Sequence, residues 1–220
     1  MFIEVPDLLD AAQVQHIQEL VTKANFVDGR ISNPHSDVKK NLQIDYGDPQ
    51  FQDLSKLVAD ALMANETVQN YACVSRFAPP LICRYQTGMS YGRHYDAAFL
   101  PLRPTPLRSD LSGTVFLSDP DTYEGGELRV ELASKQLLFK GAAGSAILYP
   151  STSIHEVMPV TSGERLVAIT FIESRIKDEN ERYLLYLLNE IAALEGFNIS
   201  EENRMRLQYV CANLERKWSS

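Results

Sequence analysis

Apolar residues at helical spacing mark both ends of the chain. Near the N-terminus, Asp10 and Gln13 form a capping-box pattern in front of such a stripe, which predicts a helix that begins there. A second helix is expected to open at Asp48, because the proline that follows is favoured at the first helical position. The same spacing returns over 180–194 and again from Ser200. We therefore expect amphipathic helices before and after the central region.

The central region has the pattern of a β protein. Its apolar runs are short and are separated by Gly, Pro and Asp, which is typical of strands joined by tight turns. The expected strands cover 114–117, 126–130, 136–139, 145–149, 154–160 and 166–171. Strands at this spacing predict a β-sandwich or barrel. The chain is therefore predicted to be mainly β with flanking helices, an α+β protein with helical support over 1–71, a β core over 72–175 and a helical extension over 176–220.

Composition and charge narrow the function classes. With 220 residues, of which 45% are apolar and 23% charged, the chain can form one domain with its own core. Its net charge of −8 argues against general binding to nucleic acid or an anionic membrane, which requires a basic face. No stretch resembles a membrane span or a signal peptide. Three cysteines without a Cys-x-x-Cys motif fit a reducing cytoplasm better than a disulfide framework.

The pattern His-x-Asp occurs twice, and its context separates the two copies. His35 and Asp37 lie in a polar, turn-like stretch, where a solvated loop is the simplest interpretation. His94 and Asp96 lie in a tyrosine-rich segment inside the β region. On a strand, residues i and i+2 point to the same face, so an imidazole nitrogen and a carboxylate oxygen would enter one cavity. The second pair is therefore the candidate metal-binding pair.

A third ligand is needed, because two side chains hold a metal ion poorly. His155 is the candidate, since it opens a predicted strand later in the same β region. Two histidines and one carboxylate on one face of an octahedron leave open positions, which suits non-haem Fe(II) oxygen chemistry. A closed structural zinc site would need a fourth ligand, and no cysteine lies at useful spacing. A core or hairpin histidine is the alternative interpretation of His155.

Arg165 is the candidate for an anion clamp near this metal. If Thr161, Ser162 and Gly163 form a three-residue hairpin turn, Arg165 shares a strand face with His155. A dicarboxylate could then chelate the metal at one end and meet the planar guanidinium fork at the other. A two-residue loop would put Arg165 on the opposite face, where it would be a surface arginine near a turn.

The residues around these candidates carry a family resemblance. The order Tyr-x-x-Gly-x-x-Tyr-x-x-His-x-Asp, then Gly-Gly-Glu-Leu, then Leu-Tyr-Pro-Ser-x-x-x-His-x-Val-x-Pro-Val-x-x-Gly-x-Arg extends from Tyr85 to Arg165. This order resembles the Fe(II)/2-oxoglutarate dioxygenases and, more narrowly, the PKHD-type hydroxylases, which are relatives of the prolyl hydroxylases. The similarity covers most of the chain, including the segment 38–43 and the helical C-terminal tail, whereas the stretch 31–37 departs from the pattern.

The resemblance implies a double-stranded β-helix, or jelly roll, with iron held by His94, Asp96 and His155. It also implies that Arg165 binds the distal carboxylate of 2-oxoglutarate and that Tyr85 lines the cosubstrate pocket. The expected reaction couples decarboxylation of 2-oxoglutarate to succinate and CO2 with hydroxylation of a C–H bond by O2. Ascorbate is expected to keep the iron reduced.

The segment 97–111 follows the ligand pair and is too rich in proline for a central strand. Two interpretations stay open for it. It is either a connecting loop or a lid over the site, whose Arg103 and Arg108 attract an anionic substrate.

The sequence leaves rival functions and several partners open. A metal- or 2-oxoglutarate-binding sensor of cupin-like fold and a metal-dependent hydrolase are the rivals, and the candidate clamp Arg165 favours the hydroxylase. The substrate could be a peptide prolyl residue, a free amino acid or an iron-chelating metabolite, and the acidic charge makes nucleic acid the least favoured partner. The apolar C-terminal helices could pack on the core or form a homodimer.

Overall fold

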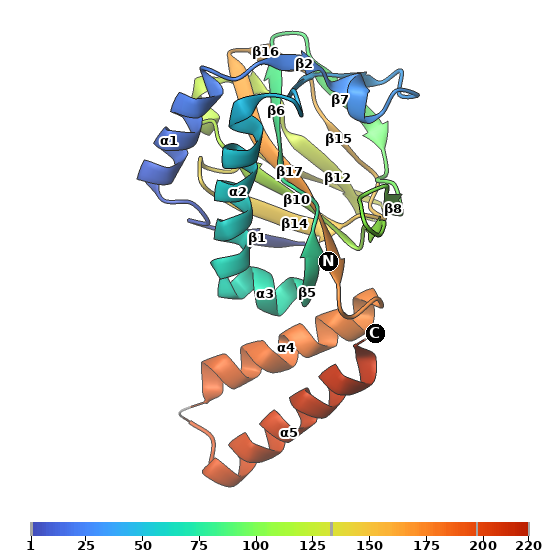
Figure 1. Cartoon of the computed structure of the whole chain (residues 1–220). Helices are drawn as coiled ribbons and strands as arrows, with labels where there is room; N and C mark the ends of the chain where they lie inside the picture. Colours follow the sequence, from blue (N-terminus) through green and yellow to red (C-terminus); the bar gives the residue numbers. More distant parts are fainter. Residues whose placement is uncertain (1, 133, 197, 220) are drawn as a thin grey trace.

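The computed structural model describes residues 2–132, 134–196 and 198–219, and its centre is a pair of antiparallel sheets (Figure 1). The larger sheet has the strand order β1-β14-β10-β17-β6-β4-β2, with β5 paired to β17. Its strands are β1 (Ile3–Val5), β2 (Phe26–Asp28), β4 (Leu42–Ile44), β5 (Val74–Phe77), β6 (Leu81–Gln86), β10 (Leu111–Phe116), β14 (Ala146–Pro150) and β17 (Glu164–Ser174).

The smaller sheet has the strand order β13-β12-β15-β7-β3. Its strands are β3 (Lys39–Lys40), β7 (Ser90–His94), β12 (Leu128–Leu132), β13 (Lys135–Phe139) and β15 (His155–Val157). Two short ribbons complete the described strands, and they consist of β8 (Phe99–Leu100) with β9 (Leu107–Arg108) and β11 (Glu124–Gly125) with β16 (Val160–Ser162). The predicted β-sandwich with flanking helices is confirmed.

The predicted helices are confirmed with their starts. Asp10 and Gln13 form the capping box in front of α1 (Ala11–Val21), and α2 (Pro49–Ala64) opens at Asp48 with proline in its first turn. The C-terminal pair consists of α4 (Glu179–Glu195) and α5 (Glu201–Trp218). The periodicity did not predict α3 (Glu66–Ala72) or the 3-10 turns η1 (Gly29–Ser32) and η2 (Pro120–Thr122), because such short elements hold too few residues for a period to show.

The N-terminal region contributes strands as well as helices. β1 pairs with β14 at one edge of the larger sheet, and β4 pairs with β6 toward its other edge. β3 pairs with β7 and so joins the smaller sheet. The sequence pattern did not predict these strands, since each is only two or three residues long. The segment 39–44 therefore links the two sheets at one edge of the sandwich.

Helices cover one flank of the sheets, as Figure 1 shows. α2 packs against β6 of the larger sheet, and α1 packs on α2. Their apolar stripes are fully removed from water, with Ile17, Leu54, Val58 and Leu62 at 0% exposure. Burial of such side chains stabilises the fold by roughly 1.5–3 kcal/mol each. The helices thus cover one face of the larger sheet, and its other face, toward the smaller sheet, can carry polar residues.

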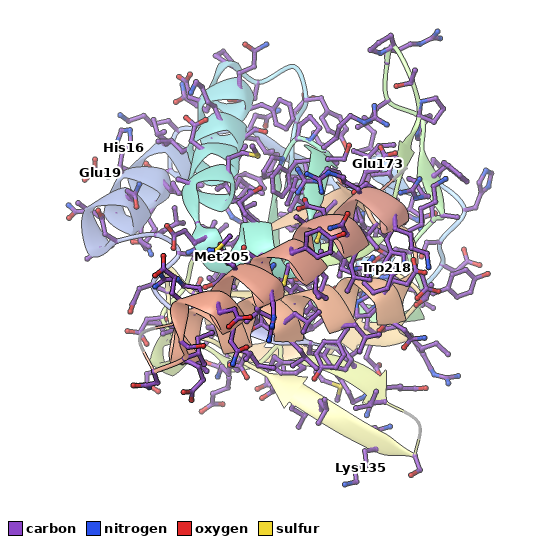
Figure 2. All side chains as sticks on the ribbon, turned by 90° about the horizontal axis from the view of Figure 1, so that it is seen from below. His16, Glu19, Lys135, Glu173, Met205 and Trp218 are labelled. Carbon is purple, nitrogen blue, oxygen red and sulfur yellow. The ribbon has the colours of Figure 1, made fainter. Side chains whose placement is uncertain are left out.

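The C-terminal helices form a separate layer below the sandwich (Figures 1 and 2). A small cluster of Cys73, Ile176 and Leu185 joins this layer to the core, and Trp218 of α5 packs against it. Figure 2 shows Met205 and Trp218 toward opposite ends of α5, and Lys135 at the tip of the β12–β13 hairpin. Among the helices that the structure describes, none has the length and apolar character needed to cross a membrane.

Candidate metal centre

Three side chains that can bind a metal meet between the two sheets. His94, Asp96 and His155 each offer one ligand atom, and these atoms lie within 4.8 Å of one another. β15 and β7 are paired so that His155 lies opposite His94, and their ring centroids are 4.3 Å apart. The Nε2 atom of His155 is 3.7 Å from Oδ2 of Asp96. The structure therefore brings together two nitrogen donors and one oxygen donor from distant parts of the chain.

Asp96 is held differently from the sequence-based expectation. β7 ends at His94, so Asp96 lies just beyond the strand rather than two residues along it. Its backbone N–H donates to the carbonyl of Ser151 at 3.3 Å, and Ser112 of β10 donates its hydroxyl to the Asp96 carboxylate. The carboxylate is thus aimed at the two histidines by contacts with the opposite sheet.

Both imidazoles are oriented by backbone carbonyls. Nδ1 of His94 lies 2.7 Å from the Gly92 carbonyl, and Nδ1 of His155 lies 3.0 Å from the Ser153 carbonyl. A carbonyl only accepts hydrogen bonds, so each Nδ1 must carry the proton. Nε2 is then the free lone pair on each ring. Such an outer hydrogen bond fixes the ring tautomer that a metal requires.

Burial sets the charge state of this cluster. Burial, reinforced by the neighbouring His155, lowers the pKa of His94 to about 4, so its imidazole is neutral at neutral pH. Burial also raises the pKa of Asp96, against the opposing effects of His155 and Ser112. A divalent cation would supply the positive charge that this carboxylate lacks. Two imidazoles and one carboxylate are a donor set that fits Fe(II) with open coordination positions.

Arg165 is buried in the same inter-sheet space and has unmet hydrogen-bonding capacity. It is 1% exposed, and within the described part of the chain its Nε and Nη1 have no hydrogen-bond partner. Its guanidinium carbon lies 5.1 Å from the ring centre of Tyr85 and 6.0 Å from that of Phe116. A buried guanidinium without an acceptor is costly, so this position fits a bound anion.

The neighbours of Arg165 place it relative to the metal ligands. On β10, Phe116 lies against Arg165, and Ser112 contacts Asp96. These two β10 residues share one face and are four positions apart, which corresponds to about 13 Å along the strand. Gly126 permits the close packing, since a Cβ there would lie 3.0 Å from Cδ of Arg165. The guanidinium and the triad therefore both lie in the space between the two sheets.

The hairpin expected around Thr161 and Gly163 is wrong. β16 pairs with β11, whereas β17, which carries Arg165, pairs with β6 and β10 of the larger sheet. The chain therefore changes sheets at Gly163, whose φ of +75° suits glycine. Arg165 reaches the cavity from the sheet opposite His155, in register with Tyr85. Burial among these groups raises the pKa of the Tyr85 hydroxyl.

The segment 97–111 is a tethered hairpin rather than an open loop. β8 and β9 pair with each other, and Arg76 donates hydrogen bonds to the backbone of Thr105 and Pro106. Arg108 is bound to Asp110 through Nε and Nη2, at 2.7 and 2.9 Å. The expectation that Arg108 attracts substrate is therefore not supported, because its guanidinium is already paired. Arg103 is exposed.

Sequence reasoning missed a second buried polar group beside the triad. Lys39 of β3 lies opposite Tyr91 in the smaller sheet and is 5% exposed, and burial lowers its pKa. Its Nζ donates to Oγ of Ser32, which in turn donates to the buried Gln43. Lys39 is buried and Lys40 is exposed, as alternate residues of a strand are. A strand of only two residues is too short for the sequence pattern to reveal this alternation.

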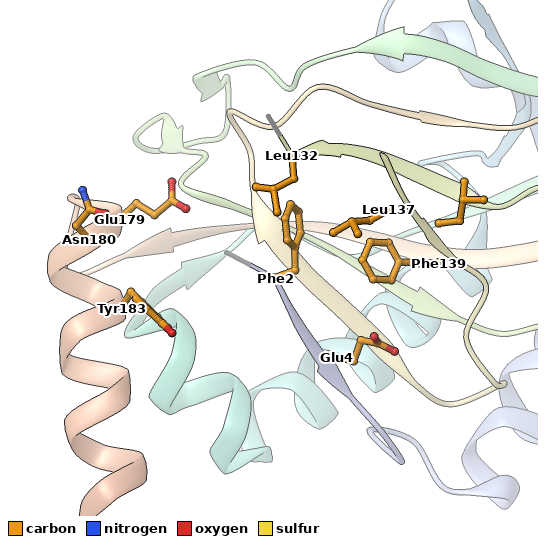
Figure 3. A pocket seen from close by; sticks show the side chains of 9 residues that line it. Phe2, Glu4, Leu132, Leu137, Phe139, Glu179, Asn180 and Tyr183 are labelled. Carbon is orange, nitrogen blue, oxygen red and sulfur yellow. The ribbon is translucent and has the colours of Figure 1, made fainter. Parts of the chain in front are cut away.

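A separate, mostly apolar groove lies away from the triad (Figure 3). It has a volume of about 630 Å³ and lies between β1, the β12–β13 hairpin and the start of α4. Its described lining is mostly apolar, with only two carboxylates among Phe2, Glu4, Leu132, Leu137, Leu138, Phe139, Glu179, Asn180 and Tyr183. None of the candidate metal ligands lines this groove.

Comparison with known proteins defines the class of this fold and site. Residues 80–173 match the model of the 2OG-Fe(II) oxygenase superfamily. The fold is similar to a prolyl hydroxylase from Trichoplax adhaerens solved with a hypoxia inducible factor peptide, with a TM-score of 0.54, 20% identity and coverage of 83% of this chain and 86% of that one. It is also similar to HygX from Streptomyces hygroscopicus, solved with nickel, 2-oxoglutarate and hygromycin B, with a TM-score of 0.54, 15% identity and coverage of 79% and 82%. The core is thus the jelly roll of these oxygenases.

A curated relative narrows the class further. A PKHD-type hydroxylase from Sphingopyxis alaskensis is 49% identical over 211 residues, which is 96% of each chain. This chain belongs to the PKHD-type hydroxylases of the 2OG-Fe(II) oxygenase superfamily. It is a 2-oxoglutarate-dependent dioxygenase, and its cofactor and cosubstrates are Fe(II), 2-oxoglutarate and O2.

Proposed function

We propose that His94, Asp96 and His155 hold the catalytic iron and that Arg165 binds the distal carboxylate of 2-oxoglutarate, with Tyr85 lining the pocket. One observation carries the assignment: a buried guanidinium with unpaired nitrogens lies in the same inter-sheet space as the triad. A hydrolase, or a sensor of the metal alone, would need the metal ligands but not a second, buried dicarboxylate anchor, and succinate formation separates the enzyme from a sensor that binds both ligands. The hydroxylase assignment therefore explains both groups at once.

The chain's own residues prepare this site for the reaction. Bound iron supplies the O2 activation that couples decarboxylation of 2-oxoglutarate to hydroxylation of a C–H bond. Arg165 orients the cosubstrate, because its planar fork pairs with a carboxylate through parallel hydrogen bonds. The aromatic rings of Tyr85 and Phe116 flank the guanidinium and exclude water, which strengthens that ion pair. Gly92 and Ser153 keep the imidazole protons on Nδ1.

Release of succinate from 2-oxoglutarate under air, measured with and without added iron, tests the function. The dioxygenase forms succinate only with iron, a sensor forms none, and a hydrolase does not decarboxylate 2-oxoglutarate. Cell extract incubated with enzyme, iron and 2-oxoglutarate should in addition yield a product one oxygen atom heavier than its precursor. A chain that binds both ligands but never forms succinate would exclude the proposed hydroxylase.

The substrate is proposed to be a peptide or a small molecule rather than a nucleic acid. The acidic net charge of −8 supports this choice. We also propose ascorbate as the reductant that maintains Fe(II), supported by the redox chemistry that such an iron site requires. A cytoplasmic location is proposed because Cys73, Cys83 and Cys211 are all free thiols, as a reducing compartment favours. Loss of activity over repeated turnovers without ascorbate would test the reductant.

A homodimer is proposed from the surface of α4. Four apolar side chains with the three- and four-residue spacing of one helix stripe are exposed there: Leu184, Leu187, Ile191 and Leu194. An exposed stripe of this kind is typical of a helix that packs against another protein surface. Sedimentation equilibrium of the wild type and of Ile191→Glu tests this assembly, and a monomeric wild type would exclude it.

A further inference from the structure

A lysine is buried at the edge of the cavity without a counter-charge. Lys39 is 5% exposed, and its inward direction follows from its pairing with Tyr91 on the same face of the smaller sheet. Among the described residues, no carboxylate lies within ion-pair distance of its Nζ, and Asp28 and Asp96 act on it only from farther away. A buried cation is costly unless it is paired and hydrogen-bonded. The structure therefore leaves a partner of Lys39 to be supplied.

Gln43 extends this group from the other sheet. It is 0% exposed, and its register with Cys83 places it on the inner face of the larger sheet. Ser32 bridges the two residues, since its hydroxyl accepts from Nζ of Lys39 at 2.6 Å and donates to Oε1 of Gln43 at 2.7 Å. Among the described residues, Nε2 of Gln43 has no hydrogen-bond partner. The Gln43 amide is close enough to the Tyr46 hydroxyl to lower the pKa of Tyr46, although the larger effect of burial raises that pKa.

Within Lys39, Ser32 and Gln43, the groups left without a partner in the described chain are donors, and the neighbouring Asn41 adds one buried acceptor without a partner, its Oδ1. An ammonium has three N–H groups and an amide nitrogen has two. Ser32 accepts a hydrogen bond from one N–H of Lys39 and from no N–H of Gln43. Lys39 and Gln43 together therefore have more free donors than free acceptors. A carboxylate accepts through two oxygens and has no donor of its own, which matches this set. A single ammonium with neutral donors also suits one negative charge better than the two of a phosphate monoester.

The cluster lies beside the metal ligands and near solvent. Nζ of Lys39 is 5.4 Å from the ring centre of Tyr91, and that ring stacks on His94 with centroids 3.6 Å apart. Ser32, which is hydrogen-bonded to both residues, is exposed at the residue level, so the cluster lies close to the protein surface. Arg165 is a second, separate buried cation. The charges of Lys39 and Arg165 both lower the pKa of the nearby Cys83 thiol, against the larger effect of burial, which raises it. The cavity thus has two cationic groups, only one of which the cosubstrate needs.

We propose that Lys39, with Ser32 and Gln43, forms a subsite that binds a carboxylate of the hydroxylated substrate. The proposal rests on the function given above, in which Arg165 is occupied by 2-oxoglutarate. It assigns the substrate to the class of carboxylic acids, such as an amino acid or a peptide with a free C-terminus. The carboxylate would hold the substrate next to Tyr91, with the rest of the molecule extending toward the metal.

The direct test follows the Lys39 signal by NMR in protein labelled with ¹³C and ¹⁵N in its lysine side chains. Zn(II) replaces iron so that the sample is diamagnetic, and 2-oxoglutarate is present at saturation. The substitution Lys39→Arg removes one resonance and so assigns that resonance to Lys39. Acetate is the probe, titrated against sodium chloride at equal ionic strength. We expect a saturable shift of the Lys39 signal that the exposed neighbour Lys40 does not share.

Two variants connect the shift to the cluster. Gln43→Leu should weaken acetate binding by about 3- to 10-fold, the effect of one neutral hydrogen bond, and Ser32→Ala should weaken it by a similar factor because Lys39 and Gln43 lose the hydroxyl that positions them. Ser32→Ala alters an exposed position, so it keeps the test valid if Gln43→Leu does not fold. Absence of a saturable shift overturns the proposal. A shift that occurs only without 2-oxoglutarate also overturns it, because Lys39 would then bind the cosubstrate. Binding of methyl phosphate but not acetate would replace the carboxylate with a phosphate monoester.

A second experiment addresses the substrate itself. Cell extract is divided, and the carboxyl groups of one half are converted to methylamides before fresh 2-oxoglutarate is added. We expect the oxygenated product only from the untreated half. We also expect a 10- to 100-fold lower yield with Lys39→Met, the effect of about one charged hydrogen bond, and an unchanged yield with the control Lys40→Met. Product from the amidated half overturns the proposal. If neither half gives product or succinate, the proposed function fails, while the acetate titration still judges the subsite.

Discussion

The two His-x-Asp segments contain the same functional groups in opposite surroundings. His35 and Asp37 are exposed, and they lie between η1 and β3 outside any described strand. His94 ends a strand whose neighbour brings His155 directly opposite, and Asp96 is held by Ser112. The difference is therefore in the partners and not in the motif. A pair of ligands becomes a metal site where adjoining strands supply the third donor and the outer hydrogen bonds.

Burial adds a chemical difference to this structural one. Within the site, burial lowers the pKa of His94 to about 4, so the imidazole does not carry a proton on Nε2 at neutral pH. A metal ion therefore does not compete with a proton for that nitrogen between pH 6 and 8. The surrounding fold prepares the histidine as a neutral ligand before the metal binds.

The largest expected effect comes from removing one histidine of each pair. His94→Ala should abolish binding of Fe(II), because two remaining ligands hold the metal poorly. His35→Ala should leave binding unchanged, since its side chain is exposed and does not belong to the group of ligand atoms formed by His94, Asp96 and His155. Anaerobic calorimetry with Fe(II) measures both variants, and thermal unfolding confirms that each is folded. Loss of the metal in His35→Ala with retention in His94→Ala would reverse the assignment of the two pairs.

The next effect concerns the two kinds of arginine near these pairs. Arg165→Lys should raise the KM for 2-oxoglutarate by about 10- to 100-fold, because an ammonium cannot reproduce the paired hydrogen bonds of the fork. Arg30→Lys is the matched control, since Arg30 forms an exposed ion pair with Asp28 near the first His-x-Asp pair. Succinate formation at increasing 2-oxoglutarate concentration measures both. An unchanged KM in Arg165→Lys would show that this guanidinium does not bind the cosubstrate.

A smaller effect is expected from the outer hydrogen bond of Asp96. Ser112→Ala removes the hydroxyl that donates to this carboxylate, and it should weaken iron binding by about 10-fold, as the loss of an outer-shell partner does. The maximal rate with saturating iron should change less than the iron affinity. Activity measured over a range of Fe(II) concentrations separates the two quantities. Equal iron affinity in the variant and the wild type would mean that Ser112 serves only the packing of β10.

Much of this architecture could be predicted from local pattern. The capping box at Asp10 and the proline after Asp48 define helix starts through backbone chemistry that acts within a few residues. The candidate metal ligands His94, Asp96 and His155 could be predicted as a set, because few histidines occur and their context differs so clearly, and the structure brings the three together. Family resemblance added Tyr85 and the cofactors.

The parts that sequence could not predict depend on pairing between distant segments. The chain changes sheets at Gly163, and this depends on partners 35 to 88 residues away rather than on the turn sequence itself. Arg165 faces the cavity as expected, but it does so from the opposite sheet. Lys39 was missed because a strand of two residues has no period, and only its pairing with Tyr91 shows which lysine faces inward.

The smallest expected effect concerns two arginines in the segment that follows Asp96, one paired within the fold and one exposed. Arg108 is partly buried and donates hydrogen bonds to Asp110 and to the Ser174 carbonyl, whereas Arg103 is exposed at the tip of the same hairpin. Arg108→Gln should therefore lower the free energy of unfolding by about 1 kcal/mol, and Arg103→Gln should change it by less than about 0.5 kcal/mol. Urea unfolding measures both values, and the initial rate of succinate formation at low and high salt shows whether either arginine attracts substrate. If Arg108→Gln leaves stability unchanged but makes the rate insensitive to salt, then Arg108 recruits substrate after all and its contact with Asp110 is incidental.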